Sequence, residues 1–142
     1  MPVEDVTSRG EPAEFVHGSG FAMCNEVPVE LLKIAKIEPA RAAERCVRNR
    51  DGTPRLQHVA YAVPPAMLEA VRADFEASRL PEYLSARFGD DVDMSYHDAG
   101  ATLGHDAELH ADSEGLRGFF AMVREAAASW DGSDLLRPPP GD

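Results

Sequence analysis

The sequence predicts an α+β fold in which a curved mixed sheet forms an open cup and a long helix follows the last strand. Two observations carry this prediction. Over residues 56–112, the spacing of the apolar residues predicts the order strand, helix, strand, strand, strand. Residues 113–130 then place apolar side chains at helical spacing. Residues 12–49 add the order strand, strand, helix. With 142 residues, the chain is expected to form one domain, over 12–137.

The first half of the chain is expected to start with a flexible lead-in over 1–11, which is polar and acidic. EFVHGSGFAMCN (14–25) has the composition of a strand, and its two glycines are typical of a bulge. VPVELLKIA (27–35) is a second strand candidate. Pro39 suits the first turn of a helix, so a helix is predicted over 38–49.

In the second half, LQHVAYAV (56–63) is typical of a buried strand. A helix is predicted to follow it, because Pro65 suits a first turn and three apolar residues recur at helical spacing: Leu68, Val71 and Phe75. Three further strands are expected over 81–88, 92–99 and 103–110. Asp112 and Ser113 are good N-cap residues for the helix over 113–130, and RPPPGD at 137–142 cannot continue it.

Strand periodicity sorts the polar side chains by face. In a strand over 103–110, Asp106, Glu108 and His110 share one face, while His105 points to the other. In the strand over 27–35, Glu30 shares its face with apolar side chains, which is costly unless the carboxylate is paired or metal-bound. In the strand over 56–63, His58 shares its face with two alanines, and small residues beside a histidine leave space for a ligand.

Charge and cysteine usage exclude several functions. The net charge of −11 argues against a nucleic-acid partner and against an anionic membrane surface, since both would repel the protein. Cys24 and Cys46 form no CxxC pattern, so they are expected to be buried thiols in a reducing compartment. With no hydrophobic run that could serve as a leader or a membrane span, the expected location is the cytoplasm.

Three stretches carry a resemblance to a known family: LQHVAYAV, VDMSYHDAGATLGHDAEL with its GHxxE pattern, and FFAMVREAAASWDGSDLLR. In this order and spacing they resemble the vicinal oxygen chelate superfamily, which includes glyoxalases, bleomycin-resistance proteins and extradiol dioxygenases. The resemblance implies one complete βαβββ module over 56–112. GEPAEFVHGSGFAMCNEVPVELLKIAKIEP looks like the end of a shortened preceding module, 12–49, whose opening strand and helix have no counterpart here.

The resemblance also implies a site. Family members hold a divalent metal inside a cup of two modules, and its ligands carry over onto His58, Glu108 and Glu30. One ion of Zn, Mn, Fe, Co or Ni is expected, because mixed nitrogen and oxygen ligands suit all of them. His17 is a speculative fourth ligand. Glu108 and His110 are the candidate catalytic residues, and the expected lining of the substrate site is Tyr96, Met94 and Asp106.

The resemblance implies a metal-dependent enzyme that acts on a small, vicinally oxygenated molecule by lyase, isomerase or dioxygenase chemistry. Two alternatives stay open: a metal-free protein that sequesters a small molecule, and a truncated interaction module. A homodimer is also expected, in which the 14–25 strand or the sheet of the shortened first module meets a second copy, because exposed strand edges are usually covered.

Each site residue also has a plainer interpretation. His58 could be an ordinary core histidine, and Glu30 could form an ion pair with Lys33 or Lys36. Asp106 and His110 could simply rim a polar cleft. Of the remaining histidines, His105 is expected to be structural and His97 to face solvent.

Overall fold

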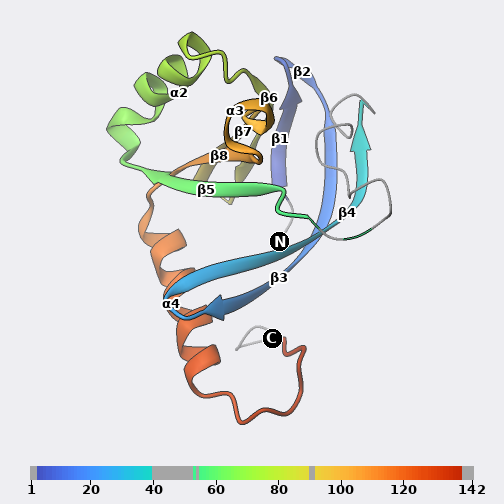
Figure 1. The fold of residues 1–142 in the computed structure, drawn as a ribbon, viewed down its shortest axis with the longest axis vertical. Helices are drawn as coiled ribbons and strands as arrows, with labels where there is room; N and C mark the ends of the chain where they lie inside the picture. Colours follow the sequence, from blue (N-terminus) through green and yellow to red (C-terminus); the bar gives the residue numbers. More distant parts are fainter. Residues whose placement is uncertain (1–2, 40–52, 54, 90–91, 139–142) are drawn as a thin grey trace.

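The protein is described by a computed structural model that covers residues 3–39, 53, 55–89 and 92–138. Its fold is α+β, with a six-stranded mixed sheet, a separate two-stranded sheet and a C-terminal helix (Figure 1). The strands of these described residues close no barrel. The predicted helix over 38–49, and with it Cys46, lies largely outside the described residues.

The large sheet has the strand order β2-β1-β6-β7-β8-β5. Its strands, in chain order, are β1 (Val3–Ser8), β2 (Glu11–Pro12), β5 (His58–Val63), β6 (Glu82–Phe88), β7 (Val92–His97) and β8 (Asp106–Ala111). Strands β6, β7 and β8 pair antiparallel in succession, and β8 then pairs parallel with β5. The order strand, helix, strand, strand, strand predicted for 56–112 is therefore confirmed. Its first strand, β5, and its last, β8, lie side by side as a parallel pair.

Helix α2 (Leu68–Ala77) covers one face of the large sheet at the β5–β8 end. It follows a single 3-10 turn, η1 (Pro65–Met67), where the fixed φ of proline suits a helix start. The predicted stripe of Leu68, Val71 and Phe75 is confirmed, since it packs against Val63 and Leu109 of the two parallel strands.

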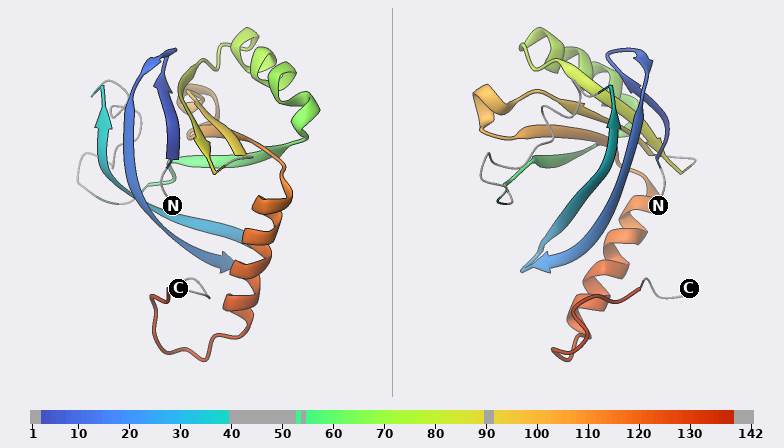
Figure 2. Two further views of the ribbon diagram at one scale, coloured as in Figure 1. Left: turned by 180° about the vertical axis from the view of Figure 1, so that it is seen from behind. Right: turned by 90° about the vertical axis from the view of Figure 1, so that its right-hand side faces the viewer.

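The second sheet is a long hairpin made of β3 (Glu14–Cys24) and β4 (Val27–Glu38). Asn25 adopts a positive φ of 54° at the turn, a conformation that asparagine tolerates well. Figure 2 shows the hairpin extending away from the large sheet and alongside α4 (Glu114–Ala128), which begins at the predicted N-cap Ser113. Phe21 of β3 meets Phe119 of α4 edge to face, with 4.8 Å between ring centroids.

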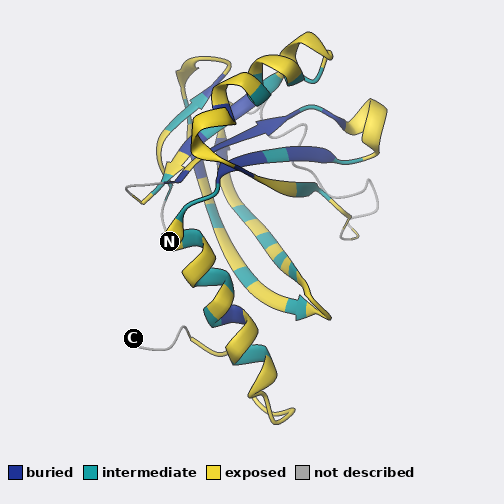
Figure 3. Ribbon diagram, turned by 90° about the vertical axis from the view of Figure 1, so that its left-hand side faces the viewer, coloured by how far each residue is buried: buried dark blue, intermediate teal, exposed yellow. Residues whose placement is uncertain are grey.

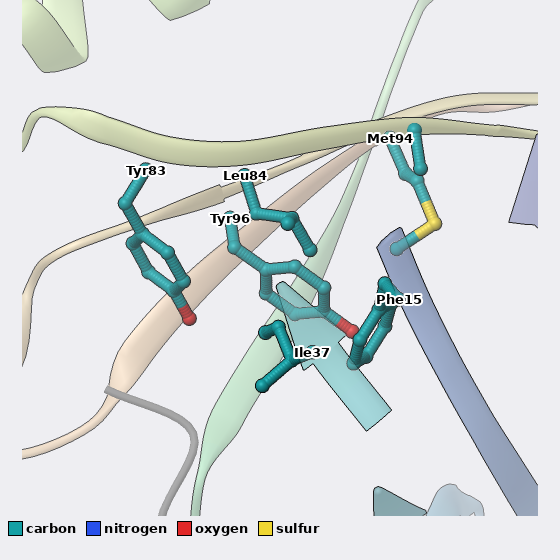
Figure 4. Close-up of a cluster of buried hydrophobic side chains, with 7 residues drawn as sticks. Phe15, Ile37, Tyr83, Leu84, Met94 and Tyr96 are labelled. Atoms are coloured by element: carbon teal, nitrogen blue, oxygen red, sulfur yellow. The ribbon is translucent and has the colours of Figure 1, made fainter. Parts of the chain in front are cut away.

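The most buried residues lie in the large sheet, whereas much of the hairpin and of α4 is exposed (Figure 3). One core cluster joins the two sheets: Phe15 and Ile37 from the hairpin contact Tyr83, Leu84, Ala86, Met94 and Tyr96 from β6 and β7 (Figure 4). The base of the hairpin is therefore fixed to the face of the sheet opposite α2.

Four predictions are wrong. Residues 1–11 are not a flexible lead-in, because Val3–Ser8 form a strand that pairs with β6. The strand predicted from residue 103 begins at Asp106, because the short helix α3 (Gly100–Leu103) precedes it and ends at Gly104 with a φ of 79°. Cys24, at the end of β3, is exposed rather than buried.

His97 was expected to face solvent, but it is 0% exposed. Its side chain does point opposite to Tyr96, yet helix α2 covers that face and packs Phe75 against the His97 ring. Both ring nitrogens are within hydrogen-bonding distance of a partner, Ser95 on one side and the Leu80 carbonyl on the other.

None of the helices described here has the length and apolar character that crossing a membrane requires.

Candidate functional site

Three side chains from three strands converge on the hairpin side of the large sheet. The Nε2 atom of His58 on β5 lies 3.0 Å from Oε2 of Glu108 on β8 and 3.5 Å from Oε2 of Glu30 on β4. All three side chains are largely buried, with exposures of 11%, 13% and 20%. The three metal ligands implied by the resemblance are thus brought into direct contact.

Strand register explains this convergence. In the parallel β5–β8 pair, His58 lies opposite Asp106 and Ala60 lies opposite Glu108, so the imidazole and the Glu108 carboxylate are diagonal neighbours on one face. In β4, alternate residues are partly buried, and Glu30 belongs to that inner set with Leu32 and Ile34. The predicted sharing of faces is therefore confirmed for all three residues.

The ion pair that could have explained Glu30 more simply is not found. Lys36 instead bonds to Glu14, with 2.6 Å between Nζ and Oε2, and Lys33 lies on the exposed face of β4. The charged partner of Glu30 in this part of the chain is His58.

The two carboxylates set the protonation of His58. Burial of the ring favours its neutral form, but the hydrogen bond and charge of Glu108, together with the charges of Glu30 and Asp106, outweigh burial and raise the pKa of His58 above 6.5. Its Nδ1 atom lies 2.5 Å from Oε1 of Gln57, an amide oxygen that can only accept. The contacts on both ring nitrogens therefore favour the protonated imidazole.

His17 on β3 supplies an unpaired nitrogen beside this group. Its Nδ1 atom is buried and has no hydrogen-bond partner among the residues that the structure describes, while its ring stacks on Phe15 with 4.5 Å between centroids. Burial lowers the pKa of His17, and the nearby charges of Glu30 and Glu108 oppose that shift. Orphaned buried nitrogens are rare and need an explanation, and a ligand is one.

Two of the three residues predicted to line the substrate site border the group. The ring of Tyr96 meets the His58 ring edge to face at 5.2 Å between centroids. Asp106 is 2% exposed and accepts a hydrogen bond from the Tyr83 hydroxyl at 3.0 Å. Burial raises the pKa of Asp106, and the bond from Tyr83 partly offsets that effect. The third, Met94, packs inside the core cluster, pointing toward Phe15 (Figure 4).

His110, a candidate base, is buried on the same face of β8 as Glu108, and its Nδ1 lies 3.4 Å from the Ala111 carbonyl oxygen. Within the described chain, no hydrogen bond or ion pair joins it to His58, Glu30 or Glu108. Two residues along a strand are separated by about 7 Å, which places His110 beside the group and not in it. His105 bonds to the Asp106 carbonyl through Nδ1, as its expected structural role requires.

The donor set fits a divalent transition metal in its chemistry. His17 and His58 offer imidazole nitrogens, and Glu30 and Glu108 offer carboxylate oxygens, which together suit Zn, Mn, Fe, Co or Ni. Among the described residues no three such side chains already stand at metal-ligand spacing. The His58–Glu108 contact has hydrogen-bond length instead, so metal binding would have to displace a proton from this pair.

Sequence reasoning missed two residues of this neighbourhood, Gln57 and Tyr83. Gln57 precedes β5 and Tyr83 lies on β6, and they meet with 3.5 Å between Nε2 and the hydroxyl oxygen. The position of Gln57 next to His58 was the one available signal. Nothing in the sequence pairs it with a tyrosine 26 residues away.

No protein-family model matches this chain, and no curated protein matches it either. The geometry around His58 is consequently the main support for a function.

Proposed function

We propose that this protein is a metal-dependent enzyme that acts on a small, vicinally oxygenated substrate by lyase, isomerase or dioxygenase chemistry. One observation carries the proposal: Glu30, His58 and Glu108 converge from three strands, within 3.5 Å of the same imidazole nitrogen. A carboxylate pair in a mostly buried place is costly for a protein to maintain without a cation, which protonated His58 supplies in the metal-free protein and a metal ion would supply when His58 is neutral. The resemblance to the vicinal oxygen chelate superfamily supports the same conclusion.

In this proposal, His58, Glu30 and Glu108 hold one divalent ion, with His17 as the fourth donor. A bound ion would supply Lewis-acid polarisation of a substrate oxygen or oxygen activation. Tyr96 and Asp106 form the surrounding wall, while Met94 lies behind them in the core cluster. Glu108 and His110 are the groups that accept and return the substrate proton, because both lie on the face of β8 that borders the group.

Calorimetric titration of metal-free, untagged protein with Mn, Zn, Ni, Co and Fe(II) tests the metal site. We expect one ion per chain for at least one metal, and loss of binding in His58→Ala. His105→Ala is the matched control, since its ring bonds outside the group. Absence of saturable binding for every metal, or unchanged binding in His58→Ala, would overturn the proposal.

The reaction itself is tested with the metal-loaded protein and a panel of vicinal diols, hydroxycarbonyl compounds and catechols. Oxygen uptake separates dioxygenation from lyase or isomerase chemistry. Glu108→Gln should abolish turnover for any member of the panel that the protein consumes.

A metal-free binding function is the second candidate, and the His58–Glu108 contact favours it. The carboxylates already have a partner when His58 is protonated, and the aromatic rings of Phe15 and Tyr96 lie beside them. Acids and aromatic rings together suit a small cationic ligand. If ligand binding persists in chelator and no metal alters it, the protein is a metal-free binding protein and not a metal-dependent enzyme.

We also propose that a second copy of this chain covers the outer face of the hairpin. Val27, Val29 and Leu31 of β4 are exposed there by 63%, 37% and 68%. Within the described chain, β3 and β4 pair only with each other, so each has one open edge. Across a two-fold axis this apolar face can pack against the same face of a second copy while the open edges lie side by side, which makes a second copy the natural occupant.

A further inference from the structure

A continuous run of close polar contacts links the candidate metal site to a buried tyrosine–aspartate pair. From Glu108 it passes to His58 Nε2 at 3.0 Å, and from His58 Nδ1 to Gln57 Oε1 at 2.5 Å. Gln57 Nε2 lies 3.5 Å from the Tyr83 hydroxyl, which is itself 3.0 Å from Asp106 Oδ2. The orientation of the His58 ring thereby depends on Gln57, which precedes β5, and on residues of β6 and β8.

The direction of each hydrogen bond follows from the Asp106 end. A carboxylate only accepts, so the Tyr83 hydroxyl donates to Asp106 and its oxygen is left to accept from the Gln57 amide. With its NH₂ group turned to Tyr83, Gln57 presents its carbonyl oxygen to His58. That oxygen cannot donate, so the Nδ1 atom of His58 must carry the proton.

Which of its two ring nitrogens carries the single proton decides whether neutral His58 can bind a metal through Nε2. With the proton on Nδ1, the Nε2 lone pair faces Glu30 and Glu108, as a metal ligand requires. In the other tautomer, Nε2–H donates to Glu108 and no lone pair is left on that side. Glu108, 3.0 Å from Nε2, favours the second tautomer, and Gln57 opposes it because the Nδ1 lone pair would then face the amide oxygen.

We propose that Gln57 is a positioning residue, oriented by Tyr83 and Asp106, that favours the Nδ1 proton of neutral His58 against the pull of Glu108 and so frees the Nε2 lone pair for a metal. The inference rests on the proposed metal-dependent function. Its basis is the contact geometry together with burial: Tyr83 is 3% and Asp106 is 2% exposed, so water does not compete for the links that orient the amide.

Two measurements on the full chain test the inference. The first is the tautomer of His58 in metal-free protein, observed by nitrogen-15 NMR at a pH where the ring is neutral. The second is Zn or Co affinity by calorimetry. We expect the Nδ1-protonated tautomer to be more populated in wild type than in Gln57→Leu. Gln57→Leu should shift His58 toward the Nε2 proton and weaken metal binding about 10- to 100-fold, the range usual for a lost partner of a ligating histidine.

Gln57→Glu should restore both properties, since its carboxylate oxygen also accepts from Nδ1. Tyr83→Phe should give a smaller loss, and the matched control Tyr61→Phe, which removes the hydroxyl of a 41% exposed ring, should give none. These variants still test the inference if Gln57→Leu does not fold. An unchanged tautomer in Gln57→Leu, or in Gln57→Glu and Tyr83→Phe alike, would overturn it. If wild type binds no metal, the proposed function fails, while the tautomer measurement still decides the role of Gln57.

Discussion

His58 shows how one side chain can depend on several strands at once. Its Nε2 atom is shared by two carboxylates, and its Nδ1 atom is engaged by Gln57. Glu108→Gln keeps the size of the side chain but removes a negative charge, so we expect metal affinity to fall at least tenfold while the fold is retained. Calorimetry and thermal melting measure the two effects.

His105→Gln is the comparison for that variant, because His105 lies three residues away and bonds only to a backbone carbonyl. It should change the melting temperature more than the metal affinity. The reverse pattern, with His105→Gln losing metal and Glu108→Gln retaining it, would mean that β8 presents its other face to the site.

The raised pKa of His58 makes the stability of the metal-free protein depend on pH. A group whose pKa is higher in the folded state than in the unfolded state stabilises the fold fully below the unfolded value, near 6.5, and that contribution is lost as pH rises through the folded value. We therefore expect the melting temperature in chelator to fall from about pH 6 upward. If a His58→Gln variant loses melting temperature with pH as steeply as wild type, the pH dependence does not come from His58.

At the scale of elements, the hairpin and α4 support each other through aromatic contacts. Phe21 lies 4.8 Å from Phe119 and 6.4 Å from Phe120 between ring centroids. Because Phe21 is 39% exposed, Phe21→Ala should lower the free energy of unfolding by about 1–2 kcal/mol, less than a fully buried phenylalanine would. Leu31→Ala, on the outer face of the same hairpin, should stay within about 0.5 kcal/mol in denaturant titration of monomeric protein.

The elements that sequence reasoning found are those with a clear local period. The alternation in 27–35 and 56–63 correctly placed Glu30 and His58 on the inner faces, and the stripe on α2 was correct as well. Strand β1 was missed because its partner β6 lies about 80 residues away, and a polar strand of six residues has no period of its own that distinguishes it from a loop.

Side-chain surroundings were less predictable than side-chain direction. The opposite orientations of Tyr96 and His97 were correct, but period two cannot say that both faces of β7 are covered. The same limit hid the Gln57–Tyr83 contact, which depends on how β5 and β6 are placed across the sheet. The left-handed Gly104 that ends α3 was present in the sequence, yet a glycine there fits a strand bulge equally well.

At the scale of the whole molecule, the hairpin is the least supported part of the fold. It forms a two-stranded sheet, and such ribbons are marginally stable alone. Phe15 anchors its base and Phe21 its distal half, while the face with Val27, Val29 and Leu31 stays exposed. Val29 and Leu31 flank Glu30 on β4, so any displacement of this strand would also move a candidate ligand.

Pairing with a second copy would remove this weakness, because a two-fold axis buries the same face of both chains in one interface. We expect light scattering at micromolar concentration to give about twice the chain mass of 15.4 kDa. Leu31→Glu should return the protein to a monomer, since a charge in the centre of an apolar interface is left without a partner. Leu135→Glu, at a residue that is 84% exposed in the C-terminal segment, should leave the mass unchanged. A wild-type monomer that still binds metal or ligand would show that the hairpin is stable enough alone, and that its apolar face serves no pairing of this chain.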